Sequence, residues 1–185
     1  MEIISCEIPG LLVLIPRVFE DDRGSFYETF NKKKFCDVTG LSEIEFFQDN
    51  ESISKLGVVR GLHFQAPPFA QGKLVRVTKG KALDVAVDIR KGSPTYGNNF
   101  SIELSEENKK MFWIPPGFAH GFAALEENTI FNYKCTNYYH PDSERSIKWN
   151  DIDLNIDWKV NQPIISEKDD LGQDFTTFAS DFDYK

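Results

Sequence analysis

Histidine is the residue type in this sequence best suited to moving protons near neutral pH, because its unperturbed pKa is about 6.5. The 185 residues hold only three: His63, His120 and His140. His63 lies in the string Arg-Gly-Leu-His-Phe-Gln, and His120 ends the string Pro-Pro-Gly-Phe-Ala-His. A histidine on an apolar strand can be a base, a metal ligand or a core residue without chemistry. Which of these three roles each histidine has depends on the strands and motifs around it.

The dominant hydrophobic period along the chain is the two-residue period of β-strands. From Lys81 to Arg90 the odd positions are apolar and mostly polar residues fall between them, which predicts a strand with one buried face. Segments rich in β-branched and aromatic residues predict further strands at 58–65, 73–78, 111–114 and 129–139. Many short strands separated by regular turns predict an all-β sandwich or a closed barrel.

Helical signals are few and short. A helix is predicted over 31–38, with Gly40 ending it, and a turn or two over 105–109. Ser166 three residues before Asp169 has the pattern of a helix N-cap. The tail from Ser166 onward is acidic and is expected to be either a docked arm or a frayed end.

Composition limits the class of protein. The length predicts one domain, and 14% aromatic residues supply ample surface for a packed core. Acidic residues outnumber basic ones by 29 to 21, so the formal charge of −8 disfavours nucleic-acid and anionic-membrane partners. The sequence shows neither an apolar run of bilayer length nor the basic opening segment of a secretory signal. Three widely spaced cysteines, Cys6, Cys36 and Cys135, predict free thiols and a cytoplasmic location.

The string that ends at His120 has the form PxGxxH, which resembles the second motif of the cupin superfamily of small β-barrels. Metal-binding cupins resemble one another in a first motif of His-x-His followed by a glutamate. Here that motif has His63 but Gln65 in place of the second histidine, and no glutamate occurs from Gln65 to Ile102. Two histidines alone make a weak transition-metal site. We therefore predict that the protein binds no metal.

An ordered series of strings is more specific than any one motif. In order, the strings are RVFEDDRGSFYE (17–28), QDNES (48–52), VRGLHFQ (59–65), QGKLVR (71–76), DVAVDIR (84–90), SPTYG (93–97), IPPGFAHGF (114–122), YKCTNYY (133–139) and PDSE (141–144). Together they closely resemble the dTDP-4-dehydrorhamnose 3,5-epimerase family. The resemblance extends from about Arg17 to Trp158, which is most of the chain.

The resemblance implies one domain over residues 1–185, with an all-β, cupin-type jelly-roll barrel and a few short helices. It implies a homodimer whose N-terminal segment crosses to the partner, with residues 166–185 as a docked arm. The implied reaction inverts C3 and C5 of dTDP-4-dehydro-6-deoxy-D-glucose through enolate intermediates and yields dTDP-4-dehydro-L-rhamnose, in dTDP-L-rhamnose biosynthesis. No cofactor is implied.

The resemblance also implies roles for single residues. His63 matches the base that removes the protons beside the C4 ketone, and Asp169 matches the carboxylate that orients it. Tyr133 matches the acid that returns a proton to the opposite ring face, and Lys73 the cation that holds the C4 oxygen. Tyr139 matches the aromatic residue that stacks on thymine. The matched substrate contacts, largely to the dTDP part, are Arg23, Glu28, Gln48, Asn50, Arg60, Lys73, His120, Glu144 and Lys168. Arg23 and Glu28 are expected to serve the partner's site.

Other interpretations stay open at this point. The scaffold also suits an epimerase that inverts C3 only, a keto-isomerase of a dTDP-4-keto-deoxysugar, a metal-dependent cupin or a non-catalytic sugar-nucleotide binder. A helix N-cap by itself accounts for Asp169. In an unbroken strand, Arg60 and His63 point to opposite faces, so both can line one pocket only if Gly61 sits in a bulge or bend.

Overall fold

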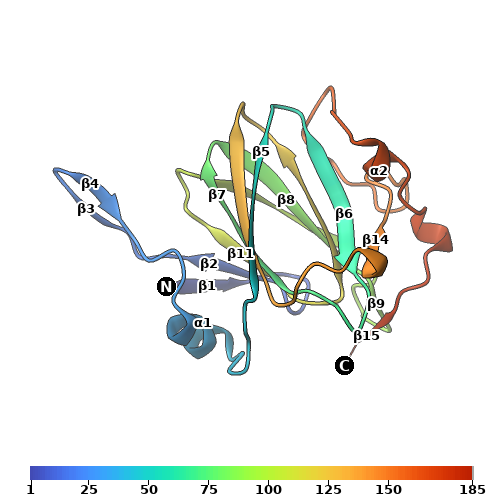
Figure 1. Ribbon diagram of the computed structural model, residues 1–185, viewed down its shortest axis with the longest axis horizontal. Helices are drawn as coiled ribbons and strands as arrows, with labels where there is room; N and C mark the ends of the chain where they lie inside the picture. Colours follow the sequence, from blue (N-terminus) through green and yellow to red (C-terminus); the bar gives the residue numbers. More distant parts are fainter. Residues whose placement is uncertain (185) are drawn as a thin grey trace.

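β-Strands are the main regular structure of the protein, which is described for residues 1–184 by a computed structural model (Figure 1). Six strands form one sheet: β1 (Glu2–Ser5), β2 (Leu12–Ile15), β5 (Gln48–Ser54), β7 (Lys73–Lys79), β11 (Met111–Ile114) and β13 (Thr129–Cys135). Five form a second: β6 (Val59–Gln65), β8 (Lys81–Asp88), β10 (Asn99–Ser105), β12 (Phe118–Ala124) and β14 (Glu144–Ser146). The short elements are β3 (Phe19–Asp21), β4 (Gly24–Phe26), β9 (Arg90–Lys91), β15 (Phe182–Asp183), α1 (Lys32–Thr39), α2 (Glu167–Asp170) and the 3-10 turns η1 (Pro141–Ser143) and η2 (Phe175–Thr177).

The two large sheets pack face to face and enclose the core of the fold. The strand order is β1-β2-β11-β7-β13-β5 in the first sheet and β10-β8-β12-β6-β14 in the second. Strands distant in sequence, such as β2 and β11, therefore lie side by side in an antiparallel arrangement, as in a jelly roll. The prediction of an all-β, cupin-type jelly roll with a few short helices is confirmed.

Local signals located α1 well but misjudged two other segments. The side chain of Asn31 caps α1 by accepting a hydrogen bond from the Lys34 amide, and Gly40 ends the helix with a φ of +74°. No helix forms at 105–109, where a turn joins β10 to β11. The strand predicted over 129–139 ends at Cys135, because the following residues leave both neighbouring strands and cross toward the other sheet.

The prediction of one buried face for the strand at Lys81 is wrong, because β8 is buried on both faces. Its odd, apolar residues pack in a cluster with Trp158 and with aromatic residues of the C-terminal segment. On the other face, Ala86 belongs to the core between the sheets, and Asp84 is fully buried there. The alternation correctly separates two faces, but it does not show that the polar face meets solvent.

A bulge in β6 brings Arg60 and His63 to the same side of their strand. His63 pairs with His120 and Arg60 pairs with Phe122, so a step of three residues in β6 matches a step of two in β12. The bulge depends on Gly61, whose φ is +128° and whose added Cβ would lie 2.5 Å from the Gly121 Cα. Only glycine fits at this close approach of two backbones.

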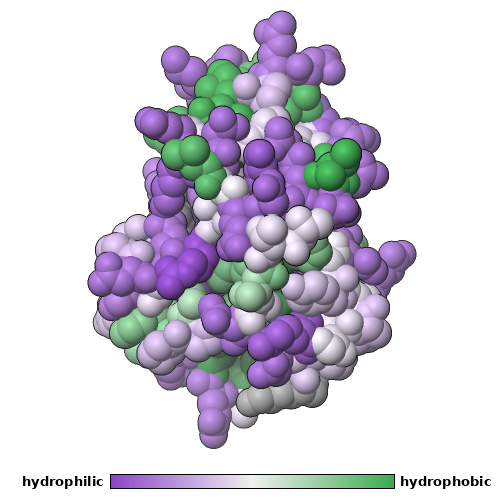
Figure 2. Space-filling view, turned by 90° about the vertical axis from the view of Figure 1, so that its right-hand side faces the viewer, coloured by the Kyte–Doolittle hydropathy of each residue, from purple (hydrophilic) through white to green (hydrophobic). Residues whose placement is uncertain are grey.

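The C-terminal segment covers the outer face of the five-stranded sheet (Figure 1). Phe178 and Phe182 place their rings 5.5 and 6.1 Å from that of Phe64 on β6. Figure 2 shows the molecule from this side as mostly hydrophilic, with apolar groups in small scattered areas. Lys185, the end of the arm predicted over 166–185, lies outside the described residues. Within residues 1–184, no helix is long and apolar enough to cross a membrane.

Candidate active site

Two adjoining cavities lie between the sheets and share a wall made by His63, Lys73 and Tyr133. The first cavity, of about 300 Å³, is also lined by Arg60, His120, Lys168 and Asp169. The second, of about 270 Å³, is also lined by Gln48, Asn50, Tyr139 and Glu144. Together they are large enough for a small-molecule ligand. The fold therefore gathers most of the site residues that the sequence singled out.

His63 and Asp169 form a close pair although 106 positions separate them in sequence. The Nε2 atom of His63 lies 2.5 Å from Oδ1 of Asp169. Asp169 sits in α2, which the side chain of Ser166 caps, so the predicted N-cap and the contact with His63 coexist. Burial is the largest single influence on Asp169 and opposes its ionisation, but the hydrogen bond and charge of His63, with hydrogen bonds from Ser166 and the Gly61 backbone, together lower the pKa of Asp169. An ionised carboxylate at this distance favours the imidazole tautomer with its proton on Nε2, in which Nδ1 carries the free lone pair.

His120 forms a second buried pair, with Asp84 of β8. Its Nε2 lies 3.0 Å from Asp84 Oδ2. Burial lowers the pKa of His120, although Asp84 acts in the opposite direction. The sequence analysis did not identify Asp84 as a site residue. The available signal was an aspartate in the middle of an otherwise apolar strand, where a charge needs a partner.

Lys73 presents an unpaired ammonium group to both cavities. None of the ion pairs or side-chain hydrogen bonds found within residues 1–184 involves this group. Burial lowers the pKa of Lys73, and the more distant charges of Cys135, Asp84 and Glu144 only partly oppose that effect. A cation without a partner in a buried wall is available to an oxygen atom of a ligand.

Tyr133 faces His63 from the opposite sheet, since Tyr133 lies on β13 and His63 on β6. Burial raises the pKa of Tyr133, so its hydroxyl stays protonated at neutral pH and can donate a proton. The nearest aromatic neighbour is Phe131, whose ring centroid lies 6.3 Å away on the same face of β13. A proton acceptor and a proton donor thus face one space from two sides.

The second cavity has a connected polar rim. Glu144 accepts hydrogen bonds of 2.6 Å from both the Tyr139 hydroxyl and the Lys168 ammonium. Burial is the largest single influence on Glu144 and opposes its ionisation, but these two bonds and the charges of Lys168 and His63 together lower the pKa of Glu144. Gln48 donates to Asn50 at 2.9 Å. The Tyr139 ring is 51% exposed and stands at the rim as a flat surface for a ligand.

Arg60 is held by a residue that the sequence analysis missed. Its Nε donates to the Ser54 hydroxyl at 3.1 Å, and the described residues offer its other two guanidinium nitrogens no hydrogen bond. Those nitrogens are free to bind an anion at the first cavity. Ser54 lies on the inward face of β5, so the two-residue period from Gln48 and Asn50 was the signal that could have identified it.

Arg23 and Glu28 are the two predicted contacts that this chain does not bring to its own cavities. Arg23 lies at the β3–β4 hairpin, which projects from the body of the molecule, and pairs with Asp21 at 2.6 Å (Figure 1). Glu28 follows the hairpin and bonds to the side chains of Asn31 and Lys34. Within one chain, neither residue can reach a ligand between the sheets.

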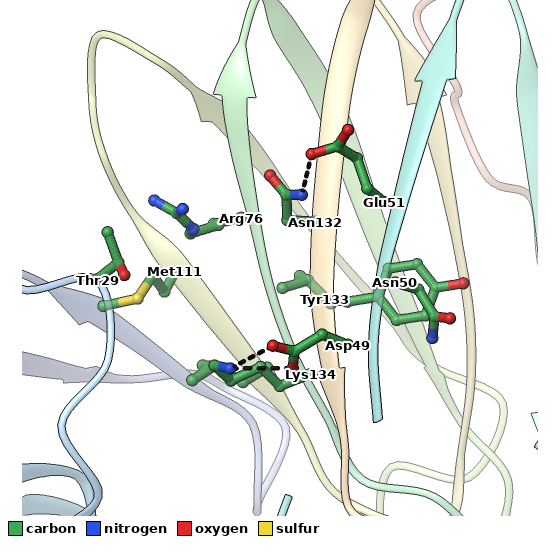
Figure 3. Close-up of a pocket in the computed structure, with 11 residues that line it drawn as sticks. Thr29, Asp49, Asn50, Glu51, Arg76, Met111, Asn132, Tyr133 and Lys134 are labelled. Atoms are coloured by element: carbon green, nitrogen blue, oxygen red, sulfur yellow. Dashed lines mark hydrogen bonds and ion pairs between the residues drawn. The ribbon is translucent and has the colours of Figure 1, made fainter. Parts of the chain in front are cut away.

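A third depression, of about 390 Å³, lies on the outer face of the six-stranded sheet (Figure 3). In it, Lys134 pairs with Asp49 at 2.8 Å, Asn132 donates a hydrogen bond of 2.8 Å to Glu51, and Arg76 donates one of 3.4 Å to the Tyr27 hydroxyl. Figure 3 shows the Tyr133 ring on the other side of β13 from Lys134. The depression therefore lacks the proton-transfer groups that the two cavities share.

Comparisons with known proteins agree with this geometry. The sequence matches the family model described as dTDP-4-dehydrorhamnose 3,5-epimerase over residues 5–177. A curated protein of that description from Shigella flexneri is 51% identical over 175 residues, which cover 95% of this chain and 96% of the relative.

Two solved structures resemble the whole fold. The dTDP-6-deoxy-D-glucose-3,5-epimerase of Legionella pneumophila, in complex with dTDP-4-keto-L-rhamnose, has a TM-score of 0.95 at 45% identity and covers 100% of this chain and 98% of its own. The dTDP-4-dehydrorhamnose 3,5-epimerase of Bacillus anthracis, with TDP and PPi bound, has a TM-score of 0.90 at 42% identity, with coverages of 94% and 99%. Both similarities extend over the strands that form the two cavities.

Proposed function

The chain belongs to the dTDP-4-dehydrorhamnose 3,5-epimerase family, and from that premise we propose how its own residues carry out the reaction. It is an epimerase that inverts C3 and C5 of dTDP-4-dehydro-6-deoxy-D-glucose through enolate intermediates. The product is dTDP-4-dehydro-L-rhamnose, in dTDP-L-rhamnose biosynthesis. What remains to be assigned is the role of each residue in the cavities.

The position of His63 and Tyr133 on opposite sheets is the observation that carries the assignment. Inversion at carbon needs a base on one face of the sugar ring and an acid on the other. His63 is the base, acting through Nδ1 while Asp169 holds Nε2. Tyr133 is the acid and returns a proton from the far side. C3 and C5 flank the same C4 ketone, so one base can serve both carbons.

Lys73 stabilises the charge that forms when the proton leaves. A proton beside a ketone is removable only if the developing oxyanion on C4 is stabilised, and a positioned ammonium in a buried site does this strongly. The unpaired Lys73 ammonium supports this role, because no carboxylate of residues 1–184 lies in an ion pair with it. The enolate oxygen would be its first close counter-charge.

The remaining polar residues hold the nucleotide. Relatives have been crystallised with dTDP-4-keto-L-rhamnose or with TDP bound, so binding of a dTDP-sugar by this chain follows from the family. We assign the thymine end to Tyr139, Gln48 and Asn50 at the rim of the second cavity. We assign the diphosphate and the sugar to four residues of the two cavities. Arg60 and Lys168 are cations, which suit a diphosphate, and His120 and Glu144 are their polar neighbours.

A single incubation tests the proposed chemistry. When the protein acts on the 4-keto sugar nucleotide in D2O, deuterium should enter at both C3 and C5, because one base reaches the protons on either side of the ketone. NMR of the two positions over time measures this directly. Deuterium confined to C3 would instead identify an enzyme that inverts C3 only, and would leave His63 as a base without a role at C5.

The β3–β4 hairpin supports a homodimer in which each chain completes the other's site. It projects from the body (Figure 1) and exposes Phe19 by 51% and Phe26 by 69%, which is unusual for large apolar side chains on a free surface. Beside them, Arg23 and Glu28 are remote from the chain's own cavities. We propose that the hairpin packs on the partner and delivers these two residues to the partner's cavities.

Mixing two inactive variants tests this arrangement. Arg23→Ala removes a proposed contact supplied to the partner, and His63→Ala removes the base of a chain's own site. In a mixed dimer, one of the two composite sites retains both residues, so up to half of the sites regain activity. We expect activity to appear only after subunits exchange. Exchange confirmed by mass spectrometry without any recovery would contradict shared sites.

Three further proposals concern the location and partners of the protein, its domain organisation, and its use of metals or cofactors. The charge of −8 and the three free cysteines favour a cytoplasmic protein without nucleic-acid or membrane partners. Residues 1–185 are proposed to work as one domain, with the segment from Ser166 as an arm that carries Asp169 to His63. We also propose that the mechanism assigned above uses no metal and no cofactor.

A further inference from the structure

Gln65 occupies the position at which metal-binding cupins have a second histidine, and here its side chain is directed to backbone groups. The residue ends β6 and is 4% exposed. Its Nε2 donates to the carbonyl oxygens of Phe69 at 2.6 Å and Tyr138 at 3.1 Å. Its Oε1 accepts a hydrogen bond of 2.8 Å from the His140 amide. The amide of Gln65 thus bonds to the backbone on both sides of Tyr139.

A second glutamine holds Tyr139 itself. Oε1 of Gln48 accepts a hydrogen bond of 2.9 Å from the Tyr139 amide. At the far end of the side chain, the Tyr139 hydroxyl donates to Glu144. The residue is therefore fixed at its backbone from two sides and at its tip from a third, although half of its ring is exposed.

These bonds are needed because the segment around Tyr139 has no strand pairing. β13 ends at Cys135, and η1 begins only at Pro141. Side-chain amides take the place of the strand-to-strand hydrogen bonds that this segment lacks, and they satisfy backbone groups that would otherwise have no partner. The ring of His140 also stacks on Phe69, with centroids 3.8 Å apart and planes within 4°, which ties the segment to the neighbouring loop.

We propose that Gln65 is a positioning residue that orders Tyr139 for the nucleotide base before the substrate arrives; this inference rests on the proposed function. An aromatic platform on a loose segment loses conformational entropy when a ligand binds, and that loss weakens binding. A platform that is already ordered avoids the loss. Gln65 also lines the second cavity, but its amide is engaged by three backbone groups and makes no hydrogen bond to His63, Lys73 or Tyr133. We therefore expect its effect on affinity and not on turnover.

The variant Gln65→Glu tests the proposal with little change in size. It replaces the NH2 group that donates to two carbonyls by an oxygen, while the acceptor for the His140 amide remains. We expect dTDP to bind about 10-fold more weakly, as the loss of two buried hydrogen bonds predicts. KM should rise by a similar factor, with kcat within about 2-fold of wild type, because His63, Lys73 and Tyr133 are untouched.

A double-mutant cycle separates positioning from general structure. In a Tyr139→Ala background, Gln65→Glu should no longer change dTDP affinity, because the platform it orders is gone. Gln173→Glu is the matched control: Gln173 also donates to a backbone carbonyl, that of Thr177 at 3.0 Å, but lines neither cavity. Equal losses of affinity with and without Tyr139, or a loss of kcat without a change in affinity, would overturn the proposal.

If the Gln65→Glu protein does not fold, two further measurements still test the proposal. Gln65→Met removes the same donors, and also the acceptor for the His140 amide, without adding a charge, so it should weaken dTDP binding at least as much. In unliganded wild type, the amides of Tyr139 and His140 should already exchange slowly with D2O, and dTDP should change their rates little. Fast exchange that dTDP suppresses would mean that the ligand orders the platform, which contradicts the proposal. Wild-type protein that fails to bind dTDP would instead refute the proposed function itself.

Discussion

Replacing His63 with asparagine is expected to abolish deuterium exchange at both C3 and C5. Neither of the other two groups in the shared wall is assigned to take the proton: Lys73 holds the C4 oxygen, and Tyr133 stays protonated, since burial raises its pKa. Without the base no enolate forms, and a positioned general base typically contributes about 10²–10⁴-fold to the rate. Following both carbons by NMR in D2O measures the loss at each position separately.

The control for this variant is its affinity for dTDP. Asparagine keeps much of the side-chain volume, so the cavity term is small, and the groups assigned to the nucleotide remain in place. We expect dTDP to bind His63→Asn nearly as tightly as wild type, which would show that the site is intact. A folded variant that still exchanges at either carbon would show that His63 is not the base and has only a structural role.

Tyr133→Phe is expected to separate the two halves of the reaction. His63 and Lys73 remain, so proton removal continues and solvent deuterium still enters at C3. Inversion at C5 should fall by about 10²–10⁴-fold, because the proton delivered from the opposite face is missing. The two rates, measured by NMR on the same sample, should therefore diverge in this variant and in no variant of the nucleotide-binding residues.

Tyr138→Phe is the matched control for the loss of one tyrosine hydroxyl. Tyr138 is 63% exposed and lines neither cavity, so this change should leave both rates close to wild type. The Tyr133 hydroxyl lies in a buried wall, and its removal leaves the ring packed near Phe131. Wild-type inversion at C5 by a folded Tyr133→Phe protein would show that another group or water supplies that proton.

Elements whose formation depends on residues close in sequence could be predicted from the sequence. Asn31 and Gly40 bracket α1 as their capping chemistry requires, and strand-like sequence patterns identified five of the eleven strands in the two large sheets. The family resemblance also named most residues that the structure gathers in the two cavities. Local rules failed at 105–109 and after Cys135, where the path of the chain depends on what lies beside it.

The sequence by itself determined which side chains share a face in strands without a bulge, and which residue types are present for acid–base chemistry. Only the tertiary structure decided which face points inward and what meets there. Asp84 became a partner of His120, and Asp169 reached His63 across 106 positions, because sheets and the C-terminal segment pack through contacts that no local period records. The Gly61 bulge likewise exists because two backbones approach closely at Gly121, and that approach places Arg60 beside His63. A two-residue period separates two faces, but the partner that covers each face is set by the rest of the fold.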